Sequence, residues 1–174
     1  MTDLDFLHIS LSDQMLYGFA GEHLCLRLAI SSAANGAGES SGSGCTPRGL
    51  HQVRARIGEG LPKGAVLKGR RWTGEVWTRA LHDECPGRDW ILTRILWLSG
   101  CEPGRNRMGE VDTFRRYIYL HGTPDCEPMS VPLSHGCIRL RNDDLLELFP
   151  RVPLHCRVRI EEAACPDWQA PQLN

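Results

Sequence analysis

The stretch Ser134-His135-Gly136-Cys137-Ile138-Arg139 places a cysteine directly behind a glycine, and the strand-like run Tyr117-Ile118-Tyr119-Leu120-His121 ends in a histidine. A free thiol has a pKa of about 8.5 and is mostly protonated at neutral pH, whereas only the thiolate attacks carbonyl groups well. An imidazole held beside the thiol removes this limitation by taking its proton. We therefore predict that Cys137 is a nucleophile, that His121 is its base, and that the pair carries out covalent acyl transfer.

The backbone around the cysteine supports this prediction. Gly136 tolerates dihedral angles and approach distances that other residues do not, so the turn before Cys137 can bring amides close to a ligand. The amides of Gly136 and Cys137 are candidate donors to the oxyanion of a tetrahedral intermediate, typically worth about 3 kcal/mol per donor. In the strand-like run, a period of two places Tyr117, Tyr119 and His121 on one face.

Neighbouring side chains leave alternatives open. His135 lies two residues from Cys137 and competes with His121 for the role of base. We favour His121 and expect His135 to be structural or to contact the substrate. Arg139 offers a bidentate guanidinium to a carboxylate, although a single arginine is more often a solvated surface charge. A zinc site is a rival interpretation, because His121, Cys126, His135 and Cys137 are zinc-type ligands. Their spacing matches no common zinc motif, and we expect neither a metal nor another cofactor.

The composition fits one soluble domain. The chain has 174 residues, of which 41% are hydrophobic, and this is enough to bury a core without disulfides or metal ions. The formal charge of −1 argues against a nucleic-acid or anionic-lipid partner. All basic residues except Lys63 and Lys68 are arginine, which is mildly suggestive of an anionic substrate.

Neither export nor disulfide bonding is expected. Asp3, Asp5 and Asp13 precede the first basic residue, Arg27, and no positive segment leads into an apolar one, so we find no secretory signal. No stretch approaches the roughly 20 apolar residues of a membrane span. We expect a cytoplasmic protein, or a periplasmic one if a leader is missing. The eight cysteines include no Cys-x-x-Cys pair, and those other than Cys137 are expected to be reduced and buried.

The pattern along the chain predicts a mainly β fold with short helices. A hairpin is expected first, then further strands, a loop over 31–44 in which nothing can pack, and a polar segment at 101–115 that is a plausible lid. The one convincing helix follows the cysteine, with Asn142 as its cap and Pro150 as its stop. The expected strands are 4–11, 14–19, 24–30, 50–57, 65–68, 90–98, 117–121 and 156–160.

The motifs together resemble the catalytic domain of the YkuD-type L,D-transpeptidases. The resemblance rests on Ser134–Arg139, on the upstream His121-Gly122 pair and on Thr46-Pro47-Arg48-Gly49, and it covers nearly the whole chain. It implies a single domain over residues 1–161 with a C-terminal tail at 162–174. The implied fold is a mixed β-sheet curved into a sandwich or barrel-like core.

The resemblance also implies roles for residues. Cys137 would form an acyl-enzyme with the peptide stem of peptidoglycan, His121 would be the base, and the carbonyl of Gly122 would orient the imidazole. The oxyanion hole would be formed by Gly136 and Cys137. Carbapenems would be the inhibitor class. The residues expected to contact the substrate are Ser134, His135, Arg139 and Tyr119.

From these observations we predict an L,D-carboxypeptidase. It would cleave the bond between meso-diaminopimelate and the terminal D-Ala of a tetrapeptide stem, with water as acceptor, and would serve the recycling of muropeptides. The alternative is an L,D-transpeptidase that forms cross-links or exchanges D-amino acids. A muropeptide-binding or zinc-binding module without turnover is the third reading. The sequence leaves the oligomeric state open.

Overall fold

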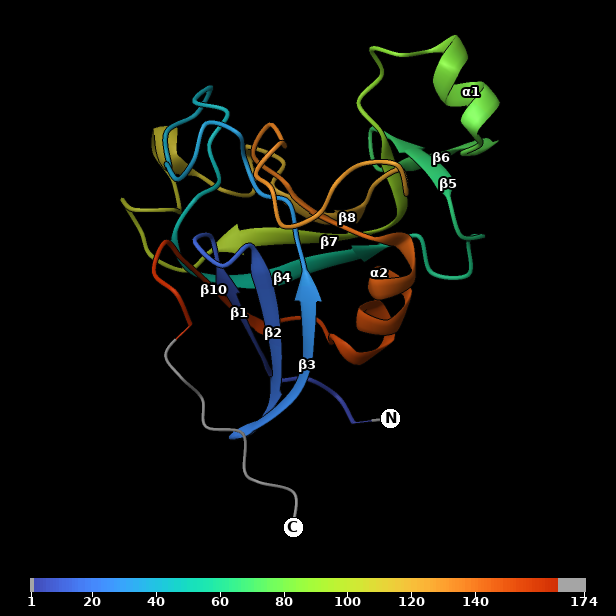
Figure 1. The fold of residues 1–174 in the computed structure, drawn as a ribbon. Coiled ribbons are helices and arrows are strands. Elements are labelled where there is room, and N and C mark those ends of the chain that lie inside the picture. Colours follow the sequence, from blue (N-terminus) through green and yellow to red (C-terminus); the bar gives the residue numbers. More distant parts are fainter. Residues whose placement is uncertain (1, 166–174) are drawn as a thin grey trace.

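The computed structural model describes residues 2–165. Within these residues, ten strands form one mixed sheet that is accompanied by short helices (Figure 1). This confirms the predicted mainly β fold. The strands are β1 (Phe6–Ser10), β2 (Met15–Ala20), β3 (His23–Ala29), β4 (Gly49–Ile57), β5 (Ala65–Lys68), β6 (Arg71–Val76), β7 (Ile91–Gly100), β8 (Tyr119–Gly122), β9 (Ile138–Leu140) and β10 (Arg157–Glu161). The helical elements are α1 (Arg79–Glu84), α2 (Asn142–Leu148) and the 3-10 turns η1 (Gly109–Val111) and η2 (Phe149–Arg151).

The strand β7 organises the sheet. The order is β3-β2-β1-β10-β4-β7-β5-β6, and β8 and β9 branch from it at β7. With ten residues, β7 is long enough to pair with β4, β5 and β8. The pairs β1–β10 and β8–β9 are parallel, and the other neighbours are antiparallel. The apolar run at 90–98, predicted as a central strand, therefore supports the strand that carries the histidine.

One large hydrophobic core lies between two parts of this sheet. Alternating side chains of β1 and β3 enter it from one side, and those of β7, β8 and β9 enter it from the other. In Figure 1, β1, β2 and β3 pass across β4 and β7, so the sheet folds over on itself. This is the sandwich-like curvature that the resemblance implied. The buried side chains from these five strands are Leu7, Ile9, Leu26, Leu28, Leu96, Leu98, Leu120, Ile138 and Leu140.

The helix α2 follows the cysteine-bearing segment, as predicted, but Asn142 does not cap it. Asn142 is the first helical residue, and Arg141 precedes it as the flanking residue. The Asn142 side chain instead accepts a hydrogen bond from Thr93 Oγ1 (2.5 Å) and donates one to the Thr123 carbonyl (2.9 Å). It thus ties the helix to β7 and to the end of β8. The apolar pattern predicts a buried stripe of Leu145, Leu146 and Phe149. Leu145 and Phe149 are buried, but Leu148 is the third buried residue and Leu146 is only partly buried.

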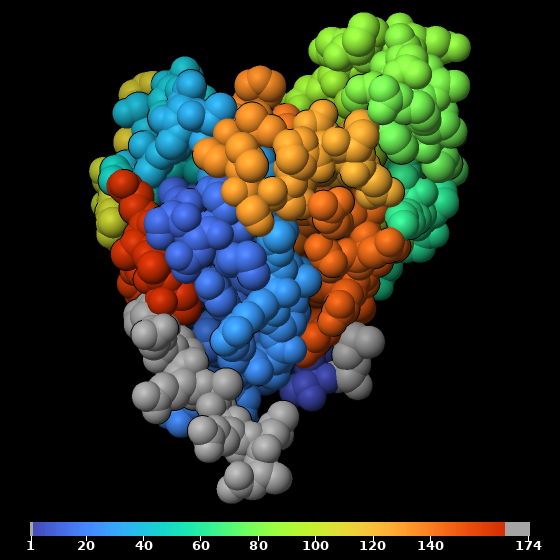
Figure 2. Space-filling view, viewed as in Figure 1, coloured from blue at the N-terminus to red at the C-terminus, as the bar shows by residue number. Residues whose placement is uncertain are grey.

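The sequence pattern does not predict β6 or α1. Most of β6 is exposed and α1 has no buried residue, so neither shows the apolar periodicity that reveals such elements. Thr78 caps α1 by accepting a hydrogen bond from the Leu81 amide (3.1 Å). Figure 2 shows this region protruding from the body of the molecule. A separate small cluster supports it, formed by Val66, Trp90 and Leu92 with Trp77, Leu81 and Cys85 around them.

The expectation that nothing packs in the loop 31–44 is wrong for its first residues. Ser31, Ser32 and Ala33 are buried, and the backbone of Ser31 pairs with Arg139. Small side chains allow two backbones to approach closely, so a segment without apolar bulk is still ordered by its hydrogen bonds. The segment before Cys137 also lies against this loop, since the Ser134 amide donates to the Ser32 carbonyl (2.8 Å), and Figure 2 shows the two segments side by side at the surface. Within residues 2–165, no helix has the length and apolar character needed to cross a bilayer.

The tail expected at 162–174 begins with residues that are held to the hairpin. Ser10 Oγ donates to the Ala163 carbonyl (2.9 Å), and the Cys165 amide donates to Asp13 (2.9 Å). The proline-bearing sequence of this tail predicts a loose segment from Ala163 onward, and these contacts show that this prediction is wrong for Ala163 and Cys165. The rest of that prediction, from residue 166 onward, lies outside the described residues.

Replacing Leu98 with alanine should lower the free energy of unfolding by about 2–5 kcal/mol, because this side chain is fully buried on β7 within the main core. The matched control is Leu154→Ala, whose side chain is 52% exposed and which should change the free energy by about 0.5 kcal/mol or less. Urea denaturation followed by circular dichroism measures both. Equal effects at the two positions would contradict the assigned core.

Candidate active site

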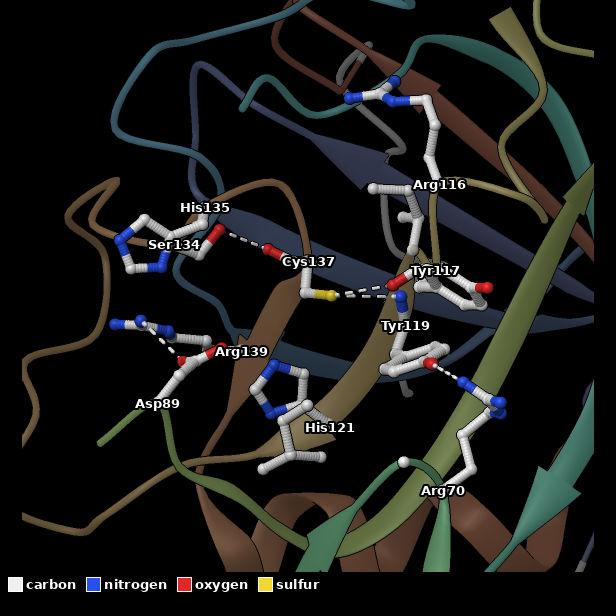
Figure 3. A pocket seen from close by; sticks show the side chains of 13 residues that line it. Arg70, Asp89, Arg116, Tyr117, Tyr119, His121, Ser134, His135, Cys137 and Arg139 are labelled. Carbon is white, nitrogen blue, oxygen red and sulfur yellow. Dashed lines mark hydrogen bonds and ion pairs between the residues drawn. The ribbon is translucent and has the colours of Figure 1, made fainter. Parts of the chain in front are cut away.

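The parallel pairing of β8 with β9 brings the predicted nucleophile and base together. His121 is opposite Arg139, and Leu120 is opposite Ile138. Because side chains alternate along a strand, Cys137 and Arg139 emerge on the same face as Tyr119 and His121. These four side chains line one cavity of about 340 Å³, in which Cys137 is half-buried (Figure 3).

The sulfur of Cys137 rests against two backbone groups of the preceding segment. Sγ donates to the Tyr117 carbonyl (3.3 Å) and accepts from the Tyr119 amide (3.3 Å). Burial disfavours the thiolate and raises the pKa of the Cys137 thiol to about 12, although the Tyr119 amide acts in the opposite direction. The surroundings of Cys137 therefore favour the neutral thiol over the thiolate.

The imidazole of His121 is held in one tautomer. Nδ1 lies 2.7 Å from the Gly122 carbonyl oxygen. A carbonyl can only accept, so Nδ1 carries the proton and Nε2 is left as an acceptor. The ring is only 2% exposed, and this burial lowers the pKa of His121. Among the described residues, no hydrogen bond joins the imidazole to Cys137, whose sulfur points to Tyr117 and Tyr119 in Figure 3.

Gly122 has no room for a side chain. A Cβ atom there would lie 2.7 Å from the Leu92 carbonyl oxygen and 2.4 Å from Asn142 Oδ1. The absence of a side chain lets β8 pass close to β7 at the point where the imidazole is anchored. The backbone carbonyl that holds His121 is thus fixed by the packing of two strands and a helix.

The turn before Cys137 is held by hydroxyl groups. Ser134 Oγ donates to the Cys137 carbonyl and accepts from the Gly136 amide (3.2 Å). Thr46 Oγ1 donates to the Gly136 carbonyl (2.9 Å) and accepts from the Ala33 amide (3.0 Å), and Thr46 is fully buried. The Gly136 amide, predicted as an oxyanion donor, is thus directed at Ser134, while the Cys137 amide takes no part in these bonds.

The arginines of the cavity differ in the groups that balance their positive charge. Arg139 Nη2 lies 3.8 Å from Asp89 Oδ1, and its side chain is 12% exposed. Arg116 donates through both terminal nitrogens to the backbone, including the Cys45 carbonyl (2.6 Å) and the Gly38 carbonyl (3.1 Å). The wall opposite Arg139 is formed by the guanidinium of Arg70 (Figure 3).

His135 lies at the rim rather than beside the sulfur. Its side chain is exposed and lines both the cavity that holds Cys137 and a second hollow of about 210 Å³. The two hollows also share Asp89 and Arg139. Cys126 is exposed on a turn and lines neither hollow. Within residues 2–165, no three side chains of the types that bind metals gather into a site.

Several cavity residues come from parts of the chain that the sequence reasoning did not assign to the site. Arg70 lies in a hairpin turn and Asp89 before β7, far from either motif, and no spacing links them to the cysteine. Tyr117 was placed on the strand, but its φ of +56° shows a turn, and β8 begins at Tyr119. The polar segment 101–115, expected as a lid, contributes no residue to the lining of the cavity, whereas Arg116 does.

Comparison with known proteins gives the family. Residues 5–160 match the L,D-transpeptidase catalytic domain, YkuD. The chain therefore belongs to this family, as its motifs predicted. It is similar to the probable L,D-transpeptidase ErfK/SrfK of Salmonella typhimurium, with 32% identity over 114 residues, which are 59% of this chain and 37% of that protein. The matched part thus spans well under half of that relative.

Solved structures share the fold. An L,D-transpeptidase from Xylanimonas cellulosilytica superposes with a TM-score of 0.53 at 17% identity, over 92% of this chain and 62% of that one. The L,D-transpeptidase LdtMt1, solved in complex with imipenem, gives a TM-score of 0.53 at 15% identity, over 91% of this chain and 59% of that one.

Replacing Gly136 with alanine should slow acylation of Cys137 by at least about tenfold, because small displacements of reacting groups are costly. The residue has a φ of +133°, and a Cβ would lie 3.2 Å from Ile118 Cδ1 and 3.3 Å from the Cys45 carbonyl oxygen. Gly87→Ala is the control, since a Cβ there meets nothing within 4 Å. The rate of adduct formation with a β-lactam, followed by mass spectrometry, measures both. Equal rates in the two variants would contradict the tight turn.

Alkylation of Cys137 by iodoacetamide should keep rising about tenfold per pH unit from pH 7 to pH 10, because only the thiolate reacts. The raised pKa of about 12 keeps the thiol protonated throughout this range. A cysteine peptide with a pKa of about 8.5 should instead level off above that pH. Peptide mapping after timed labelling measures the rate at Cys137. A plateau below pH 9 at this residue would show that the thiolate is stabilised in the resting site.

Proposed function

We propose that this domain is a cysteine acyl-transfer enzyme that acts on the tetrapeptide stem of peptidoglycan. It cleaves the bond between the L-centre of meso-diaminopimelate and the terminal D-Ala, with water as acceptor, and is thus an L,D-carboxypeptidase. The family of the chain supports the substrate class. The observation that carries the chemistry is the shared cavity, in which Cys137 and His121 lie on the same face of two paired strands.

The first half-reaction needs a proton to move as the sulfur attacks. The thiol leaves the Tyr117 carbonyl and turns to His121, whose Nε2 takes the proton because Nδ1 is held by Gly122. Sulfur forms a bond with the carbonyl carbon of the diaminopimelate L-centre, and the carbonyl oxygen becomes an oxyanion. When the C–N bond breaks, the imidazolium gives its proton to the amine of the departing D-Ala. A pair that is neutral at rest suits this transfer, because neither group has to hold a charge before the substrate binds.

The oxyanion requires donors that are not already engaged. The Cys137 amide is the first candidate, since it is absent from the hydrogen bonds that hold the turn. The Gly136 amide contributes only if it leaves Ser134 Oγ, from which it is 3.2 Å away. We therefore assign Ser134 and Thr46 the role of positioning the turn. Contact with the substrate is assigned to Tyr119, His135 and Arg139.

In the second half-reaction, water attacks the thioester. The neutral His121 takes a proton from the water, the tripeptide carboxylate forms and the cysteine regains its proton. Water needs no binding site of its own, and it reaches the sulfur through the cavity after D-Ala has left. Trimming of tetrapeptides recovered from the cell wall is the role that fits this outcome.

A second candidate is L,D-transpeptidation, in which an amine replaces water. The second hollow favours it, because this hollow adjoins the catalytic cavity at Asp89 and Arg139 and is also lined by Glu127. Glu127 forms no ion pair within residues 2–165 and suits the ammonium group of an acceptor stem, whereas Asp89 is already paired with Arg139. Both candidates share the acyl-enzyme and differ only in what resolves it.

The deciding experiment is incubation of a disaccharide-tetrapeptide with the protein, followed by mass spectrometry. Hydrolysis yields a tripeptide and free D-Ala, whereas transpeptidation yields cross-linked dimers. We expect the tripeptide as the main product and a single adduct on Cys137 when a carbapenem is added. Cys137→Ala should abolish both results, and His121→Gln should slow turnover by about 100-fold or more.

Each control tests one part of the proposal. Dimers without tripeptide would replace the water acceptor with an amine. Turnover that survives Cys137→Ala would refute the nucleophile, and an unchanged rate in His121→Gln would refute the base. Arg105→Gln is the matched control, because this residue is exposed and pairs with Glu102 outside the cavity.

A further inference from the structure

Arg70 occupies a backbone position that a large side chain rarely takes. Lys68 pairs with Arg71, so Gly69 and Arg70 form a two-residue hairpin turn between β5 and β6. Their φ values are +55° and +63°. Such turns favour glycine or asparagine at these positions, because a Cβ is strained in the left-handed region. Strain of this kind persists where the surroundings hold the residue in place, and it is frequent at ligand sites.

The guanidinium of Arg70 is held rigidly at the wall of the catalytic cavity. Its Cζ lies 4.7 Å from the centre of the Trp97 ring and 5.0 Å from that of the Tyr117 ring. Nη1 donates to Tyr119 Oη at 3.2 Å. Two aromatic faces and one hydroxyl therefore fix the plane of the cation, and both turn residues line the cavity (Figure 3).

Arg70 differs from the other arginines of the cavity in the groups that balance its positive charge. Arg139 is paired with Asp89, and Arg116 is engaged by backbone carbonyls. Within residues 2–165, Arg70 has no carboxylate within ion-pair distance, and Nη1 is its only nitrogen that donates a hydrogen bond. Among the arginines that line the cavity, Arg70 thus combines a fixed plane and free donors with the lack of a paired carboxylate. A carboxylate is the group that such donors bind most strongly.

We propose that Arg70 binds the second carboxylate of the acyl donor, the one at the D-centre of the diaminopimelate side chain. This inference rests on the proposed function and names what selects its substrate. The Tyr119 amide contacts the sulfur of Cys137 at 3.3 Å, and the Tyr119 hydroxyl contacts Arg70 at 3.2 Å, so one tyrosine residue with a contact at each end bridges the nucleophile and the cation. The side chain of diaminopimelate spans a similar length between the attacked carbonyl and its second carboxylate. The carboxylate of the departing D-Ala lies too close to the scissile bond to reach Arg70.

Binding of two matched tetrapeptides tests this assignment, one with a free D-centre carboxylate and one with a carboxamide there. Isothermal titration uses the full chain with Cys137→Ala, so that neither peptide is consumed. The free acid should bind about 10- to 100-fold more tightly, as expected for charge-assisted hydrogen bonds. Adding Arg70→Gln should remove this preference and leave the affinity for the carboxamide within about twofold.

Arg71→Gln is the matched control, because Arg71 is the neighbouring exposed arginine and does not line the cavity. It should preserve the preference for the acid. Equal loss for both peptides in Arg70→Gln would mean that Arg70 only supports the wall, and this would overturn the proposal. For a third peptide that ends in D-Ala amide, the difference in affinity from the parent acid should be the same with and without Arg70→Gln. If Arg70→Gln instead removed a difference in affinity between the parent acid and the D-Ala amide, the assignment to the D-centre would be wrong.

This readout separates the two proposals. Binding does not depend on turnover, so the comparison of acid and carboxamide decides the role of Arg70 by itself. Absence of any product from the unmodified chain would count against the proposed reaction and leave the binding result standing. A carboxamide that binds as tightly as the acid in the presence of Arg70 would overturn the inference, even if the peptide is turned over.

Discussion

The parallel pairing of β8 with β9 is the constraint on which the site depends. Two strands that run in the same direction need a long connection, and here the connection from Thr123 to Cys137 crosses the surface beside the loop 31–44. The pairing sets the register that places the sulfur one strand away from the imidazole and on the same face. A shift by one residue would turn Cys137 into the core, since neighbouring side chains point to opposite faces.

Three further contacts keep that register from slipping. Thr46 Oγ1 donates a hydrogen bond to the Gly136 carbonyl, and Ser134 Oγ donates one to the Cys137 carbonyl. The backbone of Ser31 pairs with that of Arg139 in β9. These groups are polar and buried, so losing one leaves a partner unsatisfied and carries a larger penalty than its hydrogen bond alone suggests. Thr46 of the segment Thr46-Pro47-Arg48-Gly49 thus shapes the turn that carries Cys137, although none of these four residues lines the cavity.

Prediction from the sequence succeeded where a segment shows regular hydrophobic alternation or carries a motif with a known spacing. The central strand, the hairpin, the helix after the cysteine and the cavity shared by His121 and Cys137 all follow from alternation or from motif spacing. Arg70 and Asp89 could not be found in this way, because they reach the cavity only through the pairing of β5 with β7 and the path that leads into β7. The small residues at 31–33 were misjudged for another reason: backbone hydrogen bonds, which the sequence does not display, order them. The exposed β6 and α1 likewise lack a periodic signal.

The position of β10 has a consequence for how the molecule is made. This strand, the last one within residues 2–165, lies between β1 and β4, so it joins the N-terminal hairpin to the remainder of the sheet. During synthesis the first three strands leave the ribosome long before their neighbour does, and both flanking edges stay unpaired until residue 161 has emerged. Contacts between such distant parts of the chain make folding slow and leave strand edges open to wrong partners. The nascent chain is therefore most exposed to chaperones and to aggregation just before β10 inserts between β1 and β4.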